Sequence, residues 1–271
     1  MTKAKKDMSF LEHLETLRHH IIRAILGIMI FAVLAFMFRN IIFDVIILAP
    51  KSSDFFTNAK LCQLGNYLDI DALCINQKGF QIINIKMAGQ FMTHISVSII
   101  AGLVIAFPYV FYQFWLFLKP ALKKKEIKHS RGAVFFASVL FSLGALFGYY
   151  VITPLSLHFL GGYEVSGAVL NQINLKSYIQ TITSVILASA VIFELPILIY
   201  FLSKIGLVTV DFLKKYRKHS IIVVLVLSAV ITPPDVFSQV LVAVPLFILY
   251  EVGIVIAKRI ERKQKREIKK A

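Results

Sequence analysis

The sequence has little charge and few of the residues on which enzyme chemistry depends. Charged residues make up 17% of the 271 positions, too few to cover the surface of a soluble domain of this size. The two cysteines have no histidine near them, so we expect no metal site. A GxxxxGK[ST] phosphate loop, a GxSxG nucleophile elbow and an HExxH zinc motif are all missing. These absences predict a protein that is not an enzyme, with no catalytic residue and no cofactor.

What the chain does have is apolar sequence. Hydrophobic residues make up 58% of it, and the mean hydropathy is +0.75. Six apolar segments predict six transmembrane helices, at residues 21–38, 88–118, 132–152, 178–201, 221–231 and 236–257. A helix needs ~20 residues to cross a hydrocarbon core of ~30 Å. The pattern therefore predicts an all-α polytopic membrane protein, with the whole chain, residues 1–271, forming a single membrane domain.

Two of the six segments have unusual lengths. The second is longer than a perpendicular span requires, so we expect it to tilt, project or bend at Pro108. The fifth, residues 221–231, rises only ~17 Å at ~1.5 Å per residue. We expect it to borrow flanking residues or to thin the bilayer around the fifth and sixth segments.

The basic residues indicate the orientation. Of 30 Lys and Arg residues, 24 fall in four clusters of five, six, five and eight, at residues 1–23, 119–131, 204–218 and 258–271. Six spans place all four clusters on one side, which the positive-inside rule makes cytoplasmic. We therefore predict that both termini are cytoplasmic and that residues 258–271 form a basic tail. The same distribution explains the net charge of +15 without a nucleic-acid partner.

The N-terminal 20 residues predict an amphipathic helix on the cytoplasmic surface. Ser9 and Glu12 fit a capping box, and apolar residues recur at helical spacing from Phe10 to Ile21. We expect this helix to lie along the interface and to run into the first span. No small-residue cleavage site follows the first apolar run, so we expect no cleavable signal peptide.

Residues 107–126 join an apolar helix to a basic cap. Seven of the eleven residues from Phe107 to Phe117 are aromatic, and Pro120, three consecutive lysines and the isolated Glu126 follow. An aromatic belt followed by lysines is typical of a helix that meets the cytoplasmic surface of a membrane.

The first external loop contains both cysteines. On an oxidising face, Cys62 and Cys74 could form a disulfide worth ~2–3 kcal/mol. Two free thiols in a variable loop are the alternative, and the spacing alone does not decide between them.

Two carboxylates lie in apolar segments. Glu194 lies in the sequence FELP of the fourth segment, where a charge near the bilayer centre costs ~2.5–3.5 kcal/mol. It is either paired with a neighbouring helix or a polar contact for a partner helix or a substrate. Glu251, in the sixth segment, lies nearer the cytoplasmic end and can also pair or extend to the surface.

The connection between the fifth and sixth segments has strong turn chemistry. Pro233 and Pro234 stop one helix, and Asp235 can cap the next from the external side. A tight turn explains this pattern without any function.

Four motifs in order resemble the TatC family, the multi-spanning receptor and core of the twin-arginine protein translocase. They are FLEHLETLR at residues 10–18, FP…YQFW…FLKPAL at 107–122 with Glu126, FELP at 193–196 and TPPDVFSQ at 232–239. The resemblance covers nearly the whole chain.

The resemblance implies a concave, cup-shaped bundle in the bacterial cytoplasmic (inner) membrane. The family binds folded precursors through a signal peptide with two consecutive arginines, on the cytoplasmic face. It assembles with single-span TatA/TatB-type subunits and with other TatC copies, in contact with membrane lipid, and it uses the proton-motive force.

The resemblance also implies roles for particular residues. The expected signal-peptide site comprises Glu126, Glu15, Arg18, Phe117 and Pro120. Glu126 is the main carboxylate for the arginine pair, and guanidinium against carboxylate gives directional, charge-assisted hydrogen bonds. This sequence departs from the family at Thr16, where the family has a second acid, and in the lysines around Glu126.

Away from the cytoplasmic face, the resemblance implies a polar spot within the bilayer, a partner-helix site at the outer ends of two helices, and an external cap. Thr232 and Gln239 lie where the family docks single-span helices, and Glu194 forms a polar spot in the concave face. Pro233, Pro234 and Asp235 belong to the external cap.

Two other functions fit the composition. A proton-coupled secondary transporter would use Glu194, although the halves of the chain show no internal repeat. A membrane scaffold would have no receptor role. Cross-linking to a signal peptide separates the receptor from both.

Overall fold

The computed structural model describes residues 10–268, apart from 78, 119–129, 167–170 and 233–235. The chain forms two compact units. Unit 1 comprises Met1–Met37 and Ser98–Ser138, and unit 2 comprises Phe38–Val97 and Val139–Ala271. The single membrane domain and the cup shape therefore stay predictions.

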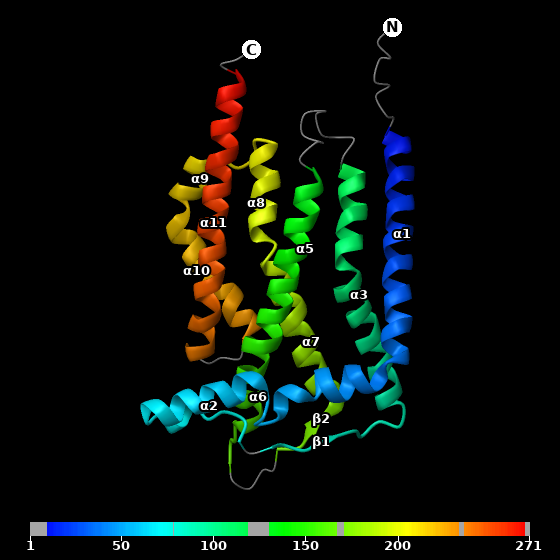
Figure 1. Cartoon of the computed structure of the whole chain (residues 1–271), viewed down its shortest axis with the longest axis vertical. Coiled ribbons are helices and arrows are strands. Elements are labelled where there is room, and N and C mark those ends of the chain that lie inside the picture. The colour runs from blue at the N-terminus through cyan, green and yellow to red at the C-terminus, as the bar shows by residue number, and fades with distance from the viewer. Residues whose placement is uncertain (1–9, 78, 119–129, 167–170, 233–235, 269–271) are drawn as a thin grey trace. The chain divides into compact units, whose positions relative to one another are not determined.

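The described chain is almost entirely helical (Figure 1). The long helices are α1 (Phe10–Met37), α3 (Gly89–Leu118), α5 (Ser130–Phe147), α7 (Leu175–Ile192), α10 (Arg217–Ile231) and α11 (Val236–Ile268). Shorter ones are α2 (Phe56–Leu68), α6 (Thr153–Gly162), α8 (Leu195–Lys204), α9 (Val210–Lys215), the 3-10 turns η2 (Ala49–Lys51) and η3 (Asp71–Leu73), and the π-helices η1 (Ile41–Ile47) and η5 (Gly148–Ile152). Strands β1 (Ile82–Ile83) and β2 (Ile173–Asn174) pair in parallel, with Ile82 opposite Ile173.

Among the described residues, five helical stretches are long and apolar enough to cross a membrane. They are Leu14–Met37, Gly89–Leu118, Gly132–Gly162, Leu175–Lys204 and Ser238–Gln264. Each overlaps a predicted span, which confirms the all-α polytopic class. The remaining predicted span is α10, whose 15 residues rise only ~22 Å, so the count of six spans stays a prediction.

Unit 1 is built on an antiparallel pair of helices. Tyr109 lies against Gly27, and Gly102 lies against Ala32, so small residues allow α1 and α3 to approach closely. Helix α1 is continuous from Phe10 to Met37, where the sequence predicted an interfacial segment followed by a span. The predicted N-cap, Ser9, lies outside the described residues.

Unit 2 contains three clusters of buried apolar side chains. One packs η1 against α6 and α7, the second packs α7 against α10 and α11, and the third packs α8 and α9 against α11. The fourth predicted segment is divided between α7 and α8, with Pro196 in the first turn of α8. Proline has no N–H to donate and its ring clashes with the preceding turn, so the helix breaks at Phe193 and Glu194.

Candidate functional site

Unit 1 brings three of the predicted signal-peptide residues to one end of a helix pair. Glu15 and Arg18 lie in the first turns of α1, and Phe117 lies in the last turn of α3. A hydrogen bond of 2.8 Å joins Nδ1 of His20 to Oε1 of Gln113. Because the helices are antiparallel, this bond fixes the start of α1 beside the end of α3.

The charged groups at this end are available for binding. Glu15 and Arg18 are exposed, and Phe117 is half-buried. Within the described part of the chain, neither the Glu15 carboxylate nor the Arg18 guanidinium forms a hydrogen bond or an ion pair. A free carboxylate can accept hydrogen bonds from a guanidinium group. An aromatic ring can stack on the flat face of the same guanidinium group. Glu126 and Pro120, which complete the predicted site, lie outside the described residues.

His20 and Gln113 are the residues of this region that sequence reasoning missed. Gln113 is only 5% exposed, in the middle of an aromatic run. A buried amide in an apolar helix needs a hydrogen-bond partner, and this was the available signal. The partner is 93 residues away, so it could not be named from the sequence.

The two carboxylates in apolar segments have different surroundings. Glu251 on α11 forms an ion pair with Arg217 of α10, with 2.6 Å between Oε1 and Nε. Both carboxylate oxygens of Glu194 are buried, and neither has a hydrogen-bond partner among the described residues. Glu194 lies where α7 meets α8, next to Phe193, whose ring centroid is 5.4 Å from that of Phe147. The structure thus pairs Glu251 and leaves the buried Glu194 carboxylate without a partner among the described residues.

The predicted partner-helix residues have partners inside the chain. The Thr232 hydroxyl donates to the carbonyl of Ser228 at 2.8 Å, and Thr232 is buried. The Gln239 amide donates to the carbonyl of Leu225 at 3.1 Å, which ties α11 to α10. Pro233, Pro234 and Asp235, the predicted external cap, lie outside the described residues.

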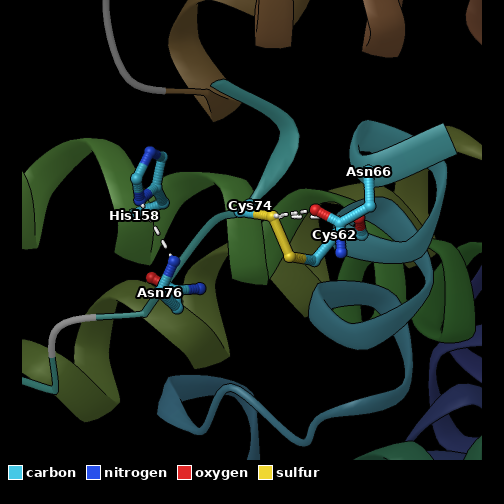
Figure 2. The surroundings of a disulfide bond; sticks show 5 residues. All are labelled: Cys62, Asn66, Cys74, Asn76 and His158. Atoms are coloured by element: carbon cyan, nitrogen blue, oxygen red, sulfur yellow. Dashed lines mark hydrogen bonds between the residues drawn. A yellow bond between two sulfur atoms is a disulfide. The ribbon is translucent and has the colours of Figure 1, made fainter. Parts of the chain in front are cut away.

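A disulfide joins Cys62 of α2 to Cys74, which follows η3 (Figure 2). The Cα atoms lie 4.1 Å apart, and the bridge closes a sequence separation of 12 residues. Beyond it, the backbone N–H of Asn76 donates to Nδ1 of His158 on α6 at 3.3 Å. The sequence left pairing and free thiols open, and the structure has the pair.

Replacing both Cys62 and Cys74 with serine is expected to lower the free energy of unfolding by ~2–3 kcal/mol, because the bridge restricts the unfolded loop. Thermal unfolding of the purified, oxidised protein measures the loss. Reductant should lower the melting temperature of the wild type and leave the double variant unchanged. An equal effect of reductant on both proteins would contradict the prediction.

Comparison with known proteins shows the family of the chain. Residues 12–245 match the family model of the Sec-independent protein translocase protein (TatC). TatC from Blattabacterium sp. subsp. Periplaneta americana is 38% identical over 97% of this chain and 100% of its own, and TatC from Aquifex aeolicus is 33% identical over the same shares. A crystal structure of the twin-arginine translocase receptor TatC is 31% identical, with a TM-score of 0.66 over 92% of this chain and 100% of that one. The resemblance seen in the sequence is thereby confirmed, and the chain belongs to the TatC family of Sec-independent protein translocase proteins.

Proposed function

We propose that this component of the Tat translocase is the receptor for twin-arginine signal peptides. The observation that carries the proposal is the end of unit 1, where the Glu15 carboxylate, which has no partner among the described residues, lies beside the last turns of α3. Two consecutive arginines present two guanidinium forks, and exposed carboxylates are the groups that bind them directionally.

In this proposal the site faces the cytoplasm. The four basic clusters put it there by the positive-inside rule, in a bacterial inner membrane with both termini inside. Folded precursors then reach the site before crossing, and single-span TatA/TatB-type subunits and further TatC copies assemble around it, with the proton-motive force driving transport.

Glu126 is proposed as the main carboxylate of the site. Because Thr16 replaces the second acid of the family motif, Glu15 lacks the carboxylate that the family has at the next position in the sequence. Glu126 lies among lysines, which attract lipid phosphates and leave the acid available if they point to the membrane surface.

The test compares two variants in a strain that lacks its own receptor. Glu126→Gln is expected to reduce export of a twin-arginine reporter by about tenfold or more, because a charge-assisted hydrogen bond contributes ~1.5–3 kcal/mol. Glu15→Gln should reduce export less, and Glu164→Gln, an exposed acid in another loop, serves as the matched control. Membrane levels of each variant are measured by immunoblot.

Two results would contradict the proposal. One is an equal and mild effect of Glu126→Gln and Glu15→Gln at normal protein levels. The other is failure of the wild-type chain to cross-link to a signal peptide, which would favour a scaffold without a receptor role.

The alternative of a proton-coupled transporter depends on Glu194. Its carboxylate has no partner among the described residues, as such a role would require. We assign Glu194 instead to a polar contact with a partner helix, because the whole-chain relatives are translocase subunits. Substrate uptake into proteoliposomes that is abolished by Glu194→Gln would favour the transporter.

A further inference from the structure

Unit 2 has a pocket of about 440 Å³ between η1 and the first turns of α3. Its polar side chains are Arg39, Asn40 and Asp44 on the η1 side and Gln90 and His94 on α3. Phe43 and Phe91 add apolar walls, and the Phe43 ring meets the His94 ring edge-on at 5.5 Å. The pocket therefore combines a cation, an anion and an amide with an aromatic wall.

The pocket lies at the boundary of the membrane. Arg39 follows the end of the span Leu14–Met37 by two residues, and Gln90 is the second residue of the span Gly89–Leu118. Apolar side chains near these polar groups face outward: Ile41 is 53% exposed, Val45 64% and Phe91 57%. Exposed apolar groups beside charged ones are typical of the zone where acyl chains meet headgroups.

The π-helix η1 carries Asp44 of the pocket. A π-helix has bonds between residues five apart, such as the one from the Leu48 N–H to the Phe43 carbonyl. Asp44 lies within this π-helix and Arg39 precedes it by two residues, and both residues line the pocket.

Two tyrosine hydroxyls hold the C-terminal end of η1 in place. The Tyr178 hydroxyl donates to the carbonyl of Ile47 at 2.8 Å, and the Tyr149 hydroxyl donates to that of Ile46 at 2.8 Å. Ile47 and Tyr178 belong to the same buried cluster. Two hydrogen bonds and a packed core thus fix the end of η1, so Asp44 is presented by a rigid element.

The charged side chains of this pocket lack partners in the part of the chain that the structure describes. Among the described residues, Arg39, Asp44 and Gln90 form no ion pair and no side-chain hydrogen bond. An anionic ligand alone would be repelled by Asp44, and a cationic ligand alone would be repelled by Arg39. A ligand that carries both charges satisfies both groups.

We propose that this pocket binds the headgroup of a zwitterionic phospholipid with a primary ammonium, as in phosphatidylethanolamine. The phosphodiester lies against Arg39, with Gln90 as a further donor, and the ammonium donates to Asp44. The acyl chains leave past Ile41 and Phe91 toward the bilayer. The proposal does not depend on the receptor role.

The experiment uses the purified full-length chain in detergent and native mass spectrometry. The protein is incubated with phosphatidylethanolamine, phosphatidylglycerol or phosphatidylcholine of identical acyl chains, and bound lipid is counted. We expect single-lipid occupancy to be about threefold or more higher for phosphatidylethanolamine than for the other two, because only its ammonium has N–H donors for Asp44 without adding net negative charge.

Two variants separate the two halves of the headgroup. Arg39→Gln should lower phosphatidylethanolamine occupancy by about threefold or more, since the phosphodiester loses its cation. Asp44→Asn should remove the preference over phosphatidylglycerol, because the carboxylate no longer selects against negative charge. Lys86→Gln and Asp54→Asn are the matched controls, because both residues are exposed and neither lines the pocket. Both variants should bind lipid like the wild type.

Three results would overturn the proposal. The first is equal binding of the three lipids by the wild type. The second is the same loss of lipid from Arg39→Gln as from Lys86→Gln. The third is displacement of bound lipid by inorganic phosphate at millimolar concentration, which would make this a free-phosphate site. Retention of lipid in the presence of phosphate, together with the two selective losses, supports a lipid site.

Discussion

Replacing Gly102 with valine is expected to separate α1 from α3 and to abolish export, with little folded protein left in the membrane. A Cβ atom at this position would lie 2.6 Å from the backbone nitrogen of Ala32 and 2.8 Å from the carbonyl oxygen of Ile28. These are backbone atoms of a helix, and they cannot rotate away as a side chain can. The helices must therefore move apart, and overpacking of this kind costs ~1–3 kcal/mol even when the structure adapts.

The consequence for the site follows from the register of the pair. Gly102 lies along the same interface as the contact of Tyr109 with Gly27 and the hydrogen bond of Gln113 with His20. Moving α3 outward at Gly102 stretches that bond, which holds the start of α1 beside the end of α3. Loss of the proposed receptor surface is thus expected even though Gly102 lies on α3 and contacts α1 at Ile28 and Ala32, several turns from Glu15.

A matched pair of alanine variants separates packing from helix propensity. Alanine favours a helix over glycine by ~1 kcal/mol, so propensity alone would stabilise both variants. At Gly132, also in unit 1, an added Cβ meets nothing within 4 Å. We expect Gly102→Ala to lower the melting temperature of the purified protein and Gly132→Ala to keep or raise it. Equal melting temperatures would show that the α1–α3 contact is not as close as the structure has it.

The spans were predictable because the bilayer sets a simple requirement. The second segment was predicted at residues 88–118 and is found as α3, Gly89–Leu118. An apolar run of that length is long enough to cross a membrane, where its backbone groups must be paired within a helix. Pro108 lies inside this helix without ending it.

The ends of the other spans depend on local geometry that periodicity does not show. The third segment was predicted to stop at Ile152 but continues through α6 to Gly162. Pro154 falls in the first turn of α6, where its missing N–H is not needed, and the π-helix η5 absorbs the change of pitch. The Thr153 hydroxyl donates to the carbonyl of Gly148 across this junction.

The polar contacts of the candidate site could not be predicted in the same way. The motif residues Glu15, Arg18 and Phe117 were identified by family resemblance, and the structure places them at one end of unit 1. Their support, the bond between His20 and Gln113, depends on two helices meeting in one register. An amide in an apolar helix is expected to need a hydrogen-bond partner. Only the packing of α1 on α3 decides which residue that partner is.

Asn58 shows the same limit in the loop, and it carries the other large effect. The loop was interpreted only through its cysteines, yet Asn58 is fully buried at 0% exposure. Its Nδ2 donates to the carbonyls of Pro50 at 3.1 Å and Ser52 at 2.7 Å, and its Oδ1 accepts from Nδ2 of Asn76 at 3.3 Å. Asn76 in turn donates to the carbonyl of Pro154 at 3.1 Å. One amide therefore connects η2, α2 and, through Asn76, α6.

Asn58→Ala is expected to lower the free energy of unfolding by about 3 kcal/mol or more, because each buried group left without a partner costs ~1–3 kcal/mol. Asn58→Asp tests the mechanism at constant size. A carboxylate can still accept from Asn76, but it cannot donate to Pro50 or Ser52, so this variant should be at least as unstable as the alanine. Asn66→Ala is the matched control, since Asn66 is exposed on the same helix α2. Thermal unfolding of the oxidised proteins gives the ranking. If Asn58→Ala and Asn66→Ala unfolded at the same temperature, the amide network would not hold the loop, and the disulfide alone would have to join α2 to the residues that follow η3.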